Sequence, residues 1–393
     1  MTAVTPRIDS TLLNDSFDRS GAKLDLILRT ISEYSPSGNE SGVAKILFDY
    51  LNKRKLFPRI DTVGNVICEF GSGEKSLLLC GHMDTVPGNL KVKMENGRIF
   101  GRGACDAKGP LLSLLFAFEN LAAQSVEEFD GKVIFAGVTD EEQSSAGLSE
   151  LIRNGVRADY ALFGEPGGLS RITVGYRGHV TLHLTIVTPE IHASAPKLVT
   201  NSAELLYEIY SSLKQVLDAQ NNESLDRISI SLTEIRSGTA HNVIPGKTTA
   251  TIDIRVPIGS RTAQVKESVR KLIDDFESKT EDAEIFVSYD EPTEPYRVSL
   301  NSPLVRALSR SILKSGSKPQ FITKSGTGDM NTYAQVFGVD TVTYGPGEAK
   351  LSHTSEENVS IQEILGCADV LSKTVNELIA VNQVNSANKE DSR

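Results

Sequence analysis

The sequence predicts an α/β fold with a mostly parallel sheet, helices on both faces of that sheet, and a second, inserted α+β domain. Short apolar runs alternate with helix-like segments in the first part of the chain and again near its end. Strands buried on both faces of a parallel sheet are apolar throughout, as these runs are. The strands of the middle section alternate apolar and polar residues, which is typical of a sheet with one open face.

The first part, residues 1–174, starts with a polar leader (1–20), followed by two helix patterns and a series of strands. The helix patterns are AKLDLILRTISEY and GVAKILFDYLNKR, and the turn residues SPSGNES separate them. The strands are GNVICEF, SLLLCG, KVIFAGV and YALFG, with the long helix PLLSLLFAFENLAAQ among them. Strands separated by helices predict a sheet whose neighbours run parallel.

The middle section, residues 175–292, follows a different order, β-α-β-β-α-β, which matches the ferredoxin-like unit. Its strands are RITVGYRGHVTLHLTIV, RISISLTEI, TTATIDIRV and EIFVSY, and its helices are SAELLYEIYSSLKQVLDA and AQVKESVRKLIDDFESK. Residues 293–393 return to the first pattern with the strand DTVTYG and end in the polar tail NQVNSANKEDSR. The middle section is therefore interpreted as an insertion into the first domain.

Length, charge and cysteine content exclude several classes of protein. The chain has 393 residues, which suits two domains, and a formal net charge of −10, which argues against a nucleic-acid binder. No apolar run approaches the ~20 residues of a membrane span. The N-terminal residues lack the basic start and apolar core of a signal peptide, so none is expected. The four cysteines form no CxxC pair. We therefore expect a soluble protein of the reducing cytoplasm, without nucleic-acid or membrane partners.

Acidic and histidine side chains follow the predicted strands, at the edge where open α/β sheets form their sites. One further acid lies in the Gly-rich turn GRGACDAKGP, ahead of the long helix. These residues are His82, Asp84, Asp106, Asp140, Glu141, Glu142, Glu165 and His353. Three acids in a row repel one another unless a positive charge lies among them, so a cation is expected at this edge.

Imidazole with carboxylate is the ligand set of zinc or a similar divalent ion. Asp84 lies two residues after His82, where a carboxylate can fix the tautomer of a metal-bound imidazole. The candidate ligands are His82, Asp106, Glu142, Glu165 and His353, too many for one ion, and this favours a two-metal site. The alternative is that the acids cap helices or lie at solvated strand ends.

The motifs GHMDTVPG, GRGACDAKGP, TDEEQSSAG, GEP and GPG…SHT resemble those of the dinuclear zinc amidohydrolases and peptidases. That family includes acetylornithine deacetylase, succinyl-diaminopimelate desuccinylase, aminoacylases and carboxypeptidase G. The resemblance covers nearly the whole chain, with the motifs in the expected order. TKSGTGDMN and YGPGEAKLSHTSEE look most like the branch that releases lysine or ornithine from a small acidic carrier protein of the LysW type.

This resemblance implies two zinc ions per subunit, for which cobalt can substitute, and a role for each matching residue. The implied ligands are His82, Asp106 and Glu165 for one ion, and Asp106, Glu142 and His353 for the other. Glu141 would be the general base that takes a proton from the attacking water and passes it to the leaving amine. Asp84 would orient His82, and the peptide bond from Asp106 to Ala107 would be cis.

The inserted domain would be the family's dimerisation (lid) domain. His192 matches the histidine that reaches a neighbouring active site and stabilises the developing oxyanion. The positions that match substrate-binding residues are Asn242, Arg255, Lys324, Gly326 and Thr327. Read without the resemblance, His192 would be a turn residue and Arg255 an ordinary strand residue.

We therefore expect a metal-dependent amide hydrolase that acts on N-acylated lysine or ornithine, joined by a γ-glutamyl amide to a carrier protein. The alternatives are a small-molecule deacylase of the acetylornithine or succinyl-diaminopimelate kind, and a dipeptidase or carboxypeptidase. A non-catalytic binding protein would not need the intact Glu141 and ligand set. A two-metal phosphatase is disfavoured because no P-loop accompanies the ligands. Asp140 is expected to order the turn that carries its two neighbours.

Overall fold

The computed structural model describes residues 20–124, 131–217 and 225–379. The predicted leader up to residue 19 and the predicted polar tail lie outside these described residues. The chain divides into two compact units. Unit 1 comprises residues 1–172, 303–320 and 343–393, and unit 2 comprises residues 173–302 and 321–342.

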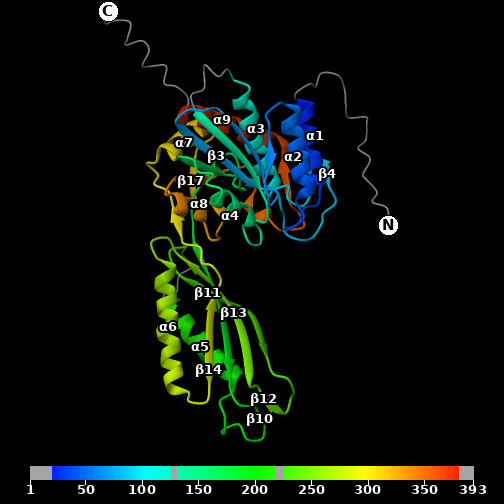
Figure 1. Ribbon diagram of the computed structural model, residues 1–393. Coiled ribbons are helices and arrows are strands. Elements are labelled where there is room, and N and C mark those ends of the chain that lie inside the picture. The colour runs from blue at the N-terminus through cyan, green and yellow to red at the C-terminus, as the bar shows by residue number, and fades with distance from the viewer. Residues whose placement is uncertain (1–19, 125–130, 218–224, 380–393) are drawn as a thin grey trace, which may run out of the picture. The chain divides into compact units, whose positions relative to one another are not determined.

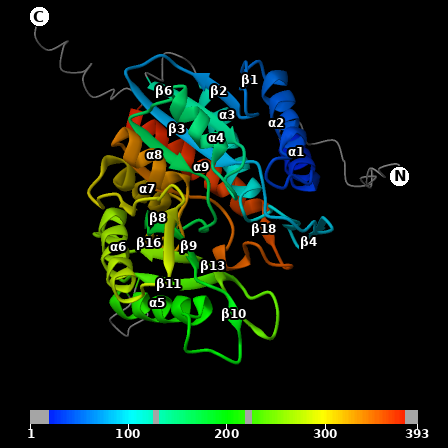
Figure 2. The same ribbon diagram turned by 60° about the horizontal axis from the view of Figure 1, so that its bottom comes forward.

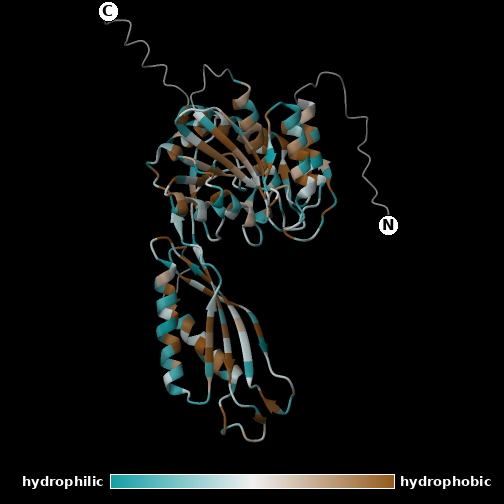
Figure 3. Cartoon of the chain, viewed as in Figure 1, coloured by the Kyte–Doolittle hydropathy of each residue, from teal (hydrophilic) through white to brown (hydrophobic). Residues whose placement is uncertain are grey.

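The sheet of unit 1 has a parallel centre. Its strands lie in the order β1 (Arg59–Ile60), β2 (Val66–Phe70), β6 (Gly131–Val138), β3 (Lys75–His82) and β7 (Tyr160–Phe163). β3 runs parallel to both of its neighbours, β6 and β7, whereas β2 is antiparallel to β6 and to β1. β3 and β6 are buried over most of their length. Figure 3 colours the central strands of this sheet largely brown, which marks hydrophobic residues. Their uninterrupted apolar sequence follows from this double burial.

The helices of unit 1 pack on this sheet and on one another (Figure 1). They are α1 (Ser20–Ser32), α2 (Ser41–Lys53), α3 (Lys108–Ala122), α4 (Ala146–Arg153), α7 (Pro303–Lys314), the 3₁₀ turn η3 (Ala349–Leu351) and α9 (Ile361–Ile379). α3 contacts β3 on one side and α9 on another, which explains why it is apolar nearly all round. Among the described residues, no helix is both long and apolar enough to cross a membrane.

A small antiparallel sheet joins two distant parts of unit 1. Its order is β18 (Asn358–Ser360), β5 (Arg98–Phe100) and β4 (Lys93–Glu95), seen at one side of Figure 2. Asn358 pairs with Phe100 and Ser360 with Arg98. This register places the segment that follows β5 beside the segment that precedes β18.

Unit 2 contains the predicted β-α-β-β-α-β order. The elements are β9 (Gly178–Val187), α5 (Ser202–Leu217), β11 (Ser229–Ser237), β13 (Lys247–Val256), α6 (Thr262–Lys279) and β14 (Glu284–Tyr289). The sheet order β11-β13-β9-β14, with every pair antiparallel, is that of a ferredoxin-like domain. Buried and half-exposed residues alternate along β9 and β13, so one face of the sheet carries the core and the other is polar.

Smaller elements complete unit 2 and the segments that lead into it. They are β8 (Arg171–Tyr176), β10 (Ile191–His192), β12 (Val243–Ile244), β15 (Tyr296–Arg297), β16 (Gln320–Lys324), α8 (Asp329–Phe337) and β17 (Asp340–Thr343). The sequence pattern alone groups α8 with the first domain. The structure places α8 in unit 2 because it packs with β15 and because the Asn331 side chain donates to the carbonyl oxygen of Glu294.

The turn after β6 is held by one buried amide. Asn65 Oδ1 accepts the backbone N–H of Thr139, and Asn65 Nδ2 donates to the carbonyl oxygen of Gly147. Gly147 in turn donates its backbone N–H to Thr139. The backbones approach so closely that only a residue without a side chain fits at position 147.

We predict that Gly147→Ala lowers the free energy of unfolding by about 1–3 kcal/mol. The added methyl carbon would lie 2.5 Å from the backbone N and O of Thr139 and 2.6 Å from Asn65 Oδ1. Backbone atoms cannot rotate away, so this clash outweighs the ~1 kcal/mol that Ala gains over Gly in a helix. Urea unfolding followed by circular dichroism measures the change.

Gly326→Ala is the matched control, because a methyl carbon there meets no atom within 4 Å. Its stability should stay within about 0.5 kcal/mol of the wild type. Equal stability of the two variants would contradict the proposed close approach at Gly147.

Candidate metal centre

The parallel register brings three of the predicted ligands, His82, Glu142 and Glu165, to one edge of the sheet of unit 1. His82 ends β3 opposite Val138, the last residue of β6, and Cys80 lies opposite Phe163, the last residue of β7. The residues that follow these strands, including Glu142 and Glu165, therefore leave the sheet at the same edge. The Asp106–Ala107 peptide bond is cis, as expected.

The five predicted ligands lie together, with Asp106 in the middle. Asp106 Oδ1 is 3.5 Å from His82 Nε2, and Asp106 Oδ2 is 3.3 Å from His353 Nε2. The same Nε2 atom of His82 is 3.9 Å from Glu165 Oε1. His353 Nε2 also lies 2.9 Å from Glu142 Oε1. The two oxygens of Asp106 thus face two different imidazoles, each with a second carboxylate beside it.

The arrangement suits a cation. Ligand atoms of His82, Asp106 and Glu142 all lie within 4.8 Å of one another. His82 Nε2 is buried and has no hydrogen-bond partner among the described residues, a costly state for a polar atom that a bond to a metal would relieve. Imidazole and carboxylate are the donors that zinc and similar ions prefer.

The pKa values show that this edge favours positive charge. Burial opposes protonation of His82, yet the carboxylates of Asp106 and Asp84 raise its pKa well above the usual range. The carboxylates of Asp106 and Glu142 raise the pKa of His353 to about 10. Burial opposes ionisation of Asp106, but the two imidazoles hold the pKa of that carboxyl far below its usual value.

Asp84 contacts both His82 and the turn that carries Asp140, Glu141 and Glu142. Its side chain is fully buried; Oδ1 lies 3.3 Å from His82 Nδ1 and accepts the backbone N–H of Glu141 at 3.1 Å. Oδ2 accepts the backbone N–H of Glu142 at 3.0 Å and the Ser37 hydroxyl at 2.7 Å. Burial opposes its ionisation, but these bonds outweigh burial and lower the pKa of Asp84 to about 2.

Asp140 orders the turn, as expected. It has a left-handed backbone (φ 62°), its carbonyl oxygen accepts the backbone N–H of Ser145, and its carboxylate accepts the Ser144 hydroxyl. Its own N–H donates to Glu40 Oε1 at 3.1 Å. Glu141 and Glu142 thereby project from a fixed turn. The charge of Glu141 is near enough to His82 to help raise the pKa of that imidazole.

Several supporting residues escape sequence reasoning. Ser37 and Glu40 come from the loop between α1 and α2, and Glu357 contacts the backbone of Asp106. The serine lies in a turn motif and the two acids are two among many, so no local pattern distinguishes them.

The remaining predicted residues belong to unit 2, where two of them are neighbours. β10 pairs with β12 so that His192 lies opposite Val243, and the carbonyl oxygen of Asn242 accepts the N–H of Ala193. His192 and Asn242 are both exposed, and His192 Nδ1 lies 2.9 Å from the Ser194 hydroxyl.

Arg255 is already engaged at the end of β13. Its Nε and Nη2 each donate to Asp253 at 2.9 Å, and His179 Nε2 lies 2.9 Å from the same carboxylate. Burial opposes ionisation of Asp253, but these partners lower the pKa of its carboxyl to about 2. The Asp253 contacts orient the guanidinium and use one edge of it.

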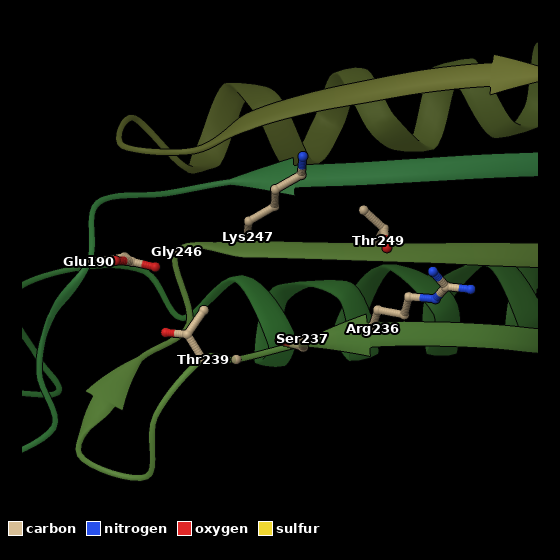
Figure 4. Close-up of a pocket in the computed structure, with 8 residues that line it drawn as sticks. Glu190, Arg236, Ser237, Thr239, Gly246, Lys247 and Thr249 are labelled. Carbon is tan, nitrogen blue, oxygen red and sulfur yellow. The ribbon is translucent and has the colours of Figure 1, made fainter.

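Lys324, Gly326 and Thr327 lie in or after β16. The Lys324 ammonium is 5.4 Å from the centroid of the Tyr176 ring, within cation–π range. Gly326 and Thr327 are partly exposed in the loop that leads to α8. Unit 2 also has a hollow of about 260 Å³, which none of the predicted site residues lines. Figure 4 shows Arg236, Thr249 and Lys247 projecting from its strands.

Comparison with known proteins confirms the predicted family. The model of "Peptidase family M20/M25/M40" matches residues 78–377. A curated protein of Saccharolobus islandicus, named LysW-lysine/LysW-ornithine hydrolase, is 34% identical over 342 residues, which cover 86% of this chain and 91% of that protein. The predicted resemblance to this branch and the prediction of a hydrolase are both in agreement with these matches.

Solved structures confirm the predicted fold class. The aminopeptidase PepT of Bacillus cereus has a TM-score of 0.77 at 20% identity, covering 91% of this chain and 98% of that one. The M20 family metallo-carboxypeptidase Sso-CP2 of Sulfolobus solfataricus has a TM-score of 0.73 at 21% identity, covering 91% and 99%. A family model matched over most of the chain, a similar fold and the clustered ligand set agree: the chain belongs to peptidase family M20/M25/M40.

Proposed function

We propose that this protein is a metal-dependent amide hydrolase that releases lysine or ornithine from an N-acyl linkage, the γ-glutamyl amide to a LysW-type carrier protein. The observation that supports the hydrolase assignment is the position of Asp106. Its two oxygens face His82 and His353 at one edge of the sheet. The support for the substrate is the Saccharolobus islandicus relative, which is named for this activity.

The ligand set supports two divalent ions that share Asp106. His82 and Glu165 would complete one ion's protein ligands, and Glu142 and His353 the other's. Mixed imidazole and carboxylate donors favour zinc, with cobalt as a substitute. When bound, such a pair of ions polarises the amide carbonyl and activates water for attack.

Residues around the ligands prepare and move protons. His82 Nδ1 lies 3.1 Å from the carbonyl oxygen of Asp84 and 3.3 Å from its Oδ1, so Asp84 accepts the Nδ1–H and Nε2 is the atom that would hold a metal ion. Glu141, on the turn that Asp84 and Asp140 hold, takes the proton of the attacking water and delivers it to the leaving amine. Glu142, next in sequence, serves as a ligand, because successive side chains of an extended segment diverge.

Residues of unit 2 contribute to substrate binding in this proposal. Residues 175–292, which make up most of unit 2, are the dimerisation (lid) domain in this proposal, and residues 1–174 and 293–393 are the catalytic domain. His192 of a neighbouring subunit stabilises the oxyanion that develops on the carbonyl. Asn242 and the free edge of Arg255 bind the amino acid, whose carboxylate suits a guanidinium. Lys324, Gly326 and Thr327 line the acyl side.

In the same proposal the protein is a homodimer in the cytoplasm. The carrier protein presents the acylated amino acid to it. A small-molecule deacylase or a peptidase is the main rival, because the same catalytic centre serves all of these amide substrates. The choice among them depends on the acyl group, so substrates decide it.

We predict that the purified protein with added zinc or cobalt hydrolyses LysW-linked lysine or ornithine at least about tenfold better than small acyl substrates. The comparison uses kcat/KM for the loaded carrier, acetylornithine, succinyl-diaminopimelate and a dipeptide, with release of the free amino acid as the assay. Fast turnover of a small substrate with none of the carrier would overturn the substrate assignment and leave the hydrolase assignment standing.

We predict that Glu141→Gln lowers kcat by about 10²–10⁴-fold, the usual contribution of a general base, while bound metal stays near the wild-type amount. The amide of glutamine cannot take a proton from water. Metal content by elemental analysis and kcat on the same preparation separate the two effects.

Two further variants test the assignment from both sides. Asp106→Asn should lose metal and activity together, because the shared ligand is weakened. Glu95→Gln, an exposed change on β4, should alter neither. Wild-type activity in Glu141→Gln would show that another group is the base.

A further inference from the structure

The turn that carries Asp106 and the loop that carries His353 come together through the small sheet of unit 1. β5 ends at Phe100 and β18 begins at Asn358, and these two residues are paired. The backbone N–H of Gly101 donates to the carbonyl oxygen of Glu357, which continues the pairing by one bond. Glu357 is thereby placed beside the Gly-rich turn, 251 positions away from Asp106 in sequence.

Glu357 holds the backbone of the shared ligand. Its Oε1 accepts the N–H groups of Cys105 and Asp106, each at 3.0 Å. Its Oε2 accepts Nη1 of Arg102 at 2.7 Å. The Glu357 side chain is 0% exposed and that of Arg102 is 9% exposed, so the charges of this pair are removed from water.

Arg102 extends the same network to two other loops. Its Nε donates to the carbonyl oxygen of Gly88, in the loop that follows His82 and Asp84. Its Nη1 also approaches the carbonyl oxygen of Thr354, next to His353, at 3.3 Å. One guanidinium therefore joins the three segments that deliver His82, Asp106 and His353.

Stability alone is a weak reason for such a pair. The desolvation cost of a buried ion pair commonly cancels its attraction, so apolar residues of similar volume would stabilise the protein as well. His353 has a left-handed backbone (φ 64°), an unfavourable conformation that persists only where neighbours impose it. Arg102, which is paired with Glu357, contacts the backbone of Thr354, the residue after His353, and so is one of the neighbours that can impose this conformation.

We propose that the Arg102–Glu357 ion pair is the positioning element of the metal centre, which sets the distance between Asp106 and His353. This inference rests on the proposed function, in which Asp106 and His353 are ligands. Arg102 and Glu357 touch neither ion nor substrate; they act through the backbones that carry the ligands.

Glu357→Gln tests the pair with almost no change in volume. Glu357 accepts hydrogen bonds at both oxygens, whereas an amide has one accepting end and one donating end. The glutamine must therefore give up either Arg102 or the N–H groups of Cys105 and Asp106. We expect metal affinity to fall by about 10–100-fold, the usual effect of losing an outer partner of a ligand.

The readouts are the metal dissociation constant, measured by competition with a chelator, and the visible absorption spectrum of the cobalt-loaded protein. The spectrum reports ligand geometry, so it should change in Glu357→Gln even when cobalt is saturating. Arg102→Lys keeps the charge and loses the fork that reaches Gly88 and Thr354. It should give a smaller shift in the same direction and covers the case in which Glu357→Gln does not fold.

Glu119→Gln is the matched control. Glu119 also accepts at both oxygens, from Arg54 Nε at 2.5 Å and from the Tyr50 hydroxyl at 2.9 Å, and it belongs to the same unit. Its partners among the described residues, Tyr50, Arg54 and Lys23, lie outside the ligand loops. It should lose thermal stability and keep wild-type metal affinity and cobalt spectrum.

Wild-type metal affinity and spectrum in Glu357→Gln, with only a stability loss like that of Glu119→Gln, would overturn the inference. A wild-type protein that binds metal but does not hydrolyse the loaded carrier would refute the substrate assignment alone. A wild-type protein that binds no divalent ion would overturn both.

Discussion

Repulsion among carboxylates is the constraint that shapes unit 1. Asp106, Glu142 and Glu165 converge at one edge of the sheet, with Asp84 beneath them. A cluster of this kind is stable only where positive charge and N–H donors surround it. The structure supplies both, since two imidazoles have raised pKa values and the buried Asp84 accepts bonds from two backbone N–H groups. The same need for positive charge suits this edge to a cation.

The scaffold meets this constraint with two different sheets. The parallel sheet brings together the ends of β3, β6 and β7, and with them His82, Glu142 and Glu165. Asp106 and His353 do not follow these three strands. They are aligned by the small β18-β5-β4 sheet, whose pairing reaches from the Gly-rich turn to the C-terminal part of the chain. A parallel sheet alone would therefore supply only part of the ligand set.

Unit 2 also pairs opposite charges, but at a place where water still reaches them, so less desolvation free energy is lost. Arg255, Asp253 and His179 form a partly exposed network on the open face of the ferredoxin-like sheet. Partial exposure lets such charges keep some hydration, so they can be rearranged for binding more easily than the buried network around Asp106. The charges that are fully removed from water are thus in unit 1, around Asp106. Unit 2 carries the groups proposed to recognise the substrate.

The sequence by itself determined the α/β and α+β patterns, the family and the identity of the five clustered residues. Each of these depends on local signals: the periodicity of burial along a strand, and residue types that follow a strand within a few positions. Tertiary structure alone decided that the two oxygens of Asp106 face different histidines, that Ser37 bonds to Asp84, and that Glu357 pairs with Arg102. Arg102 and Glu357 are 255 positions apart, and their contact depends on the register of β5 with β18, which leaves no pattern in either segment read alone.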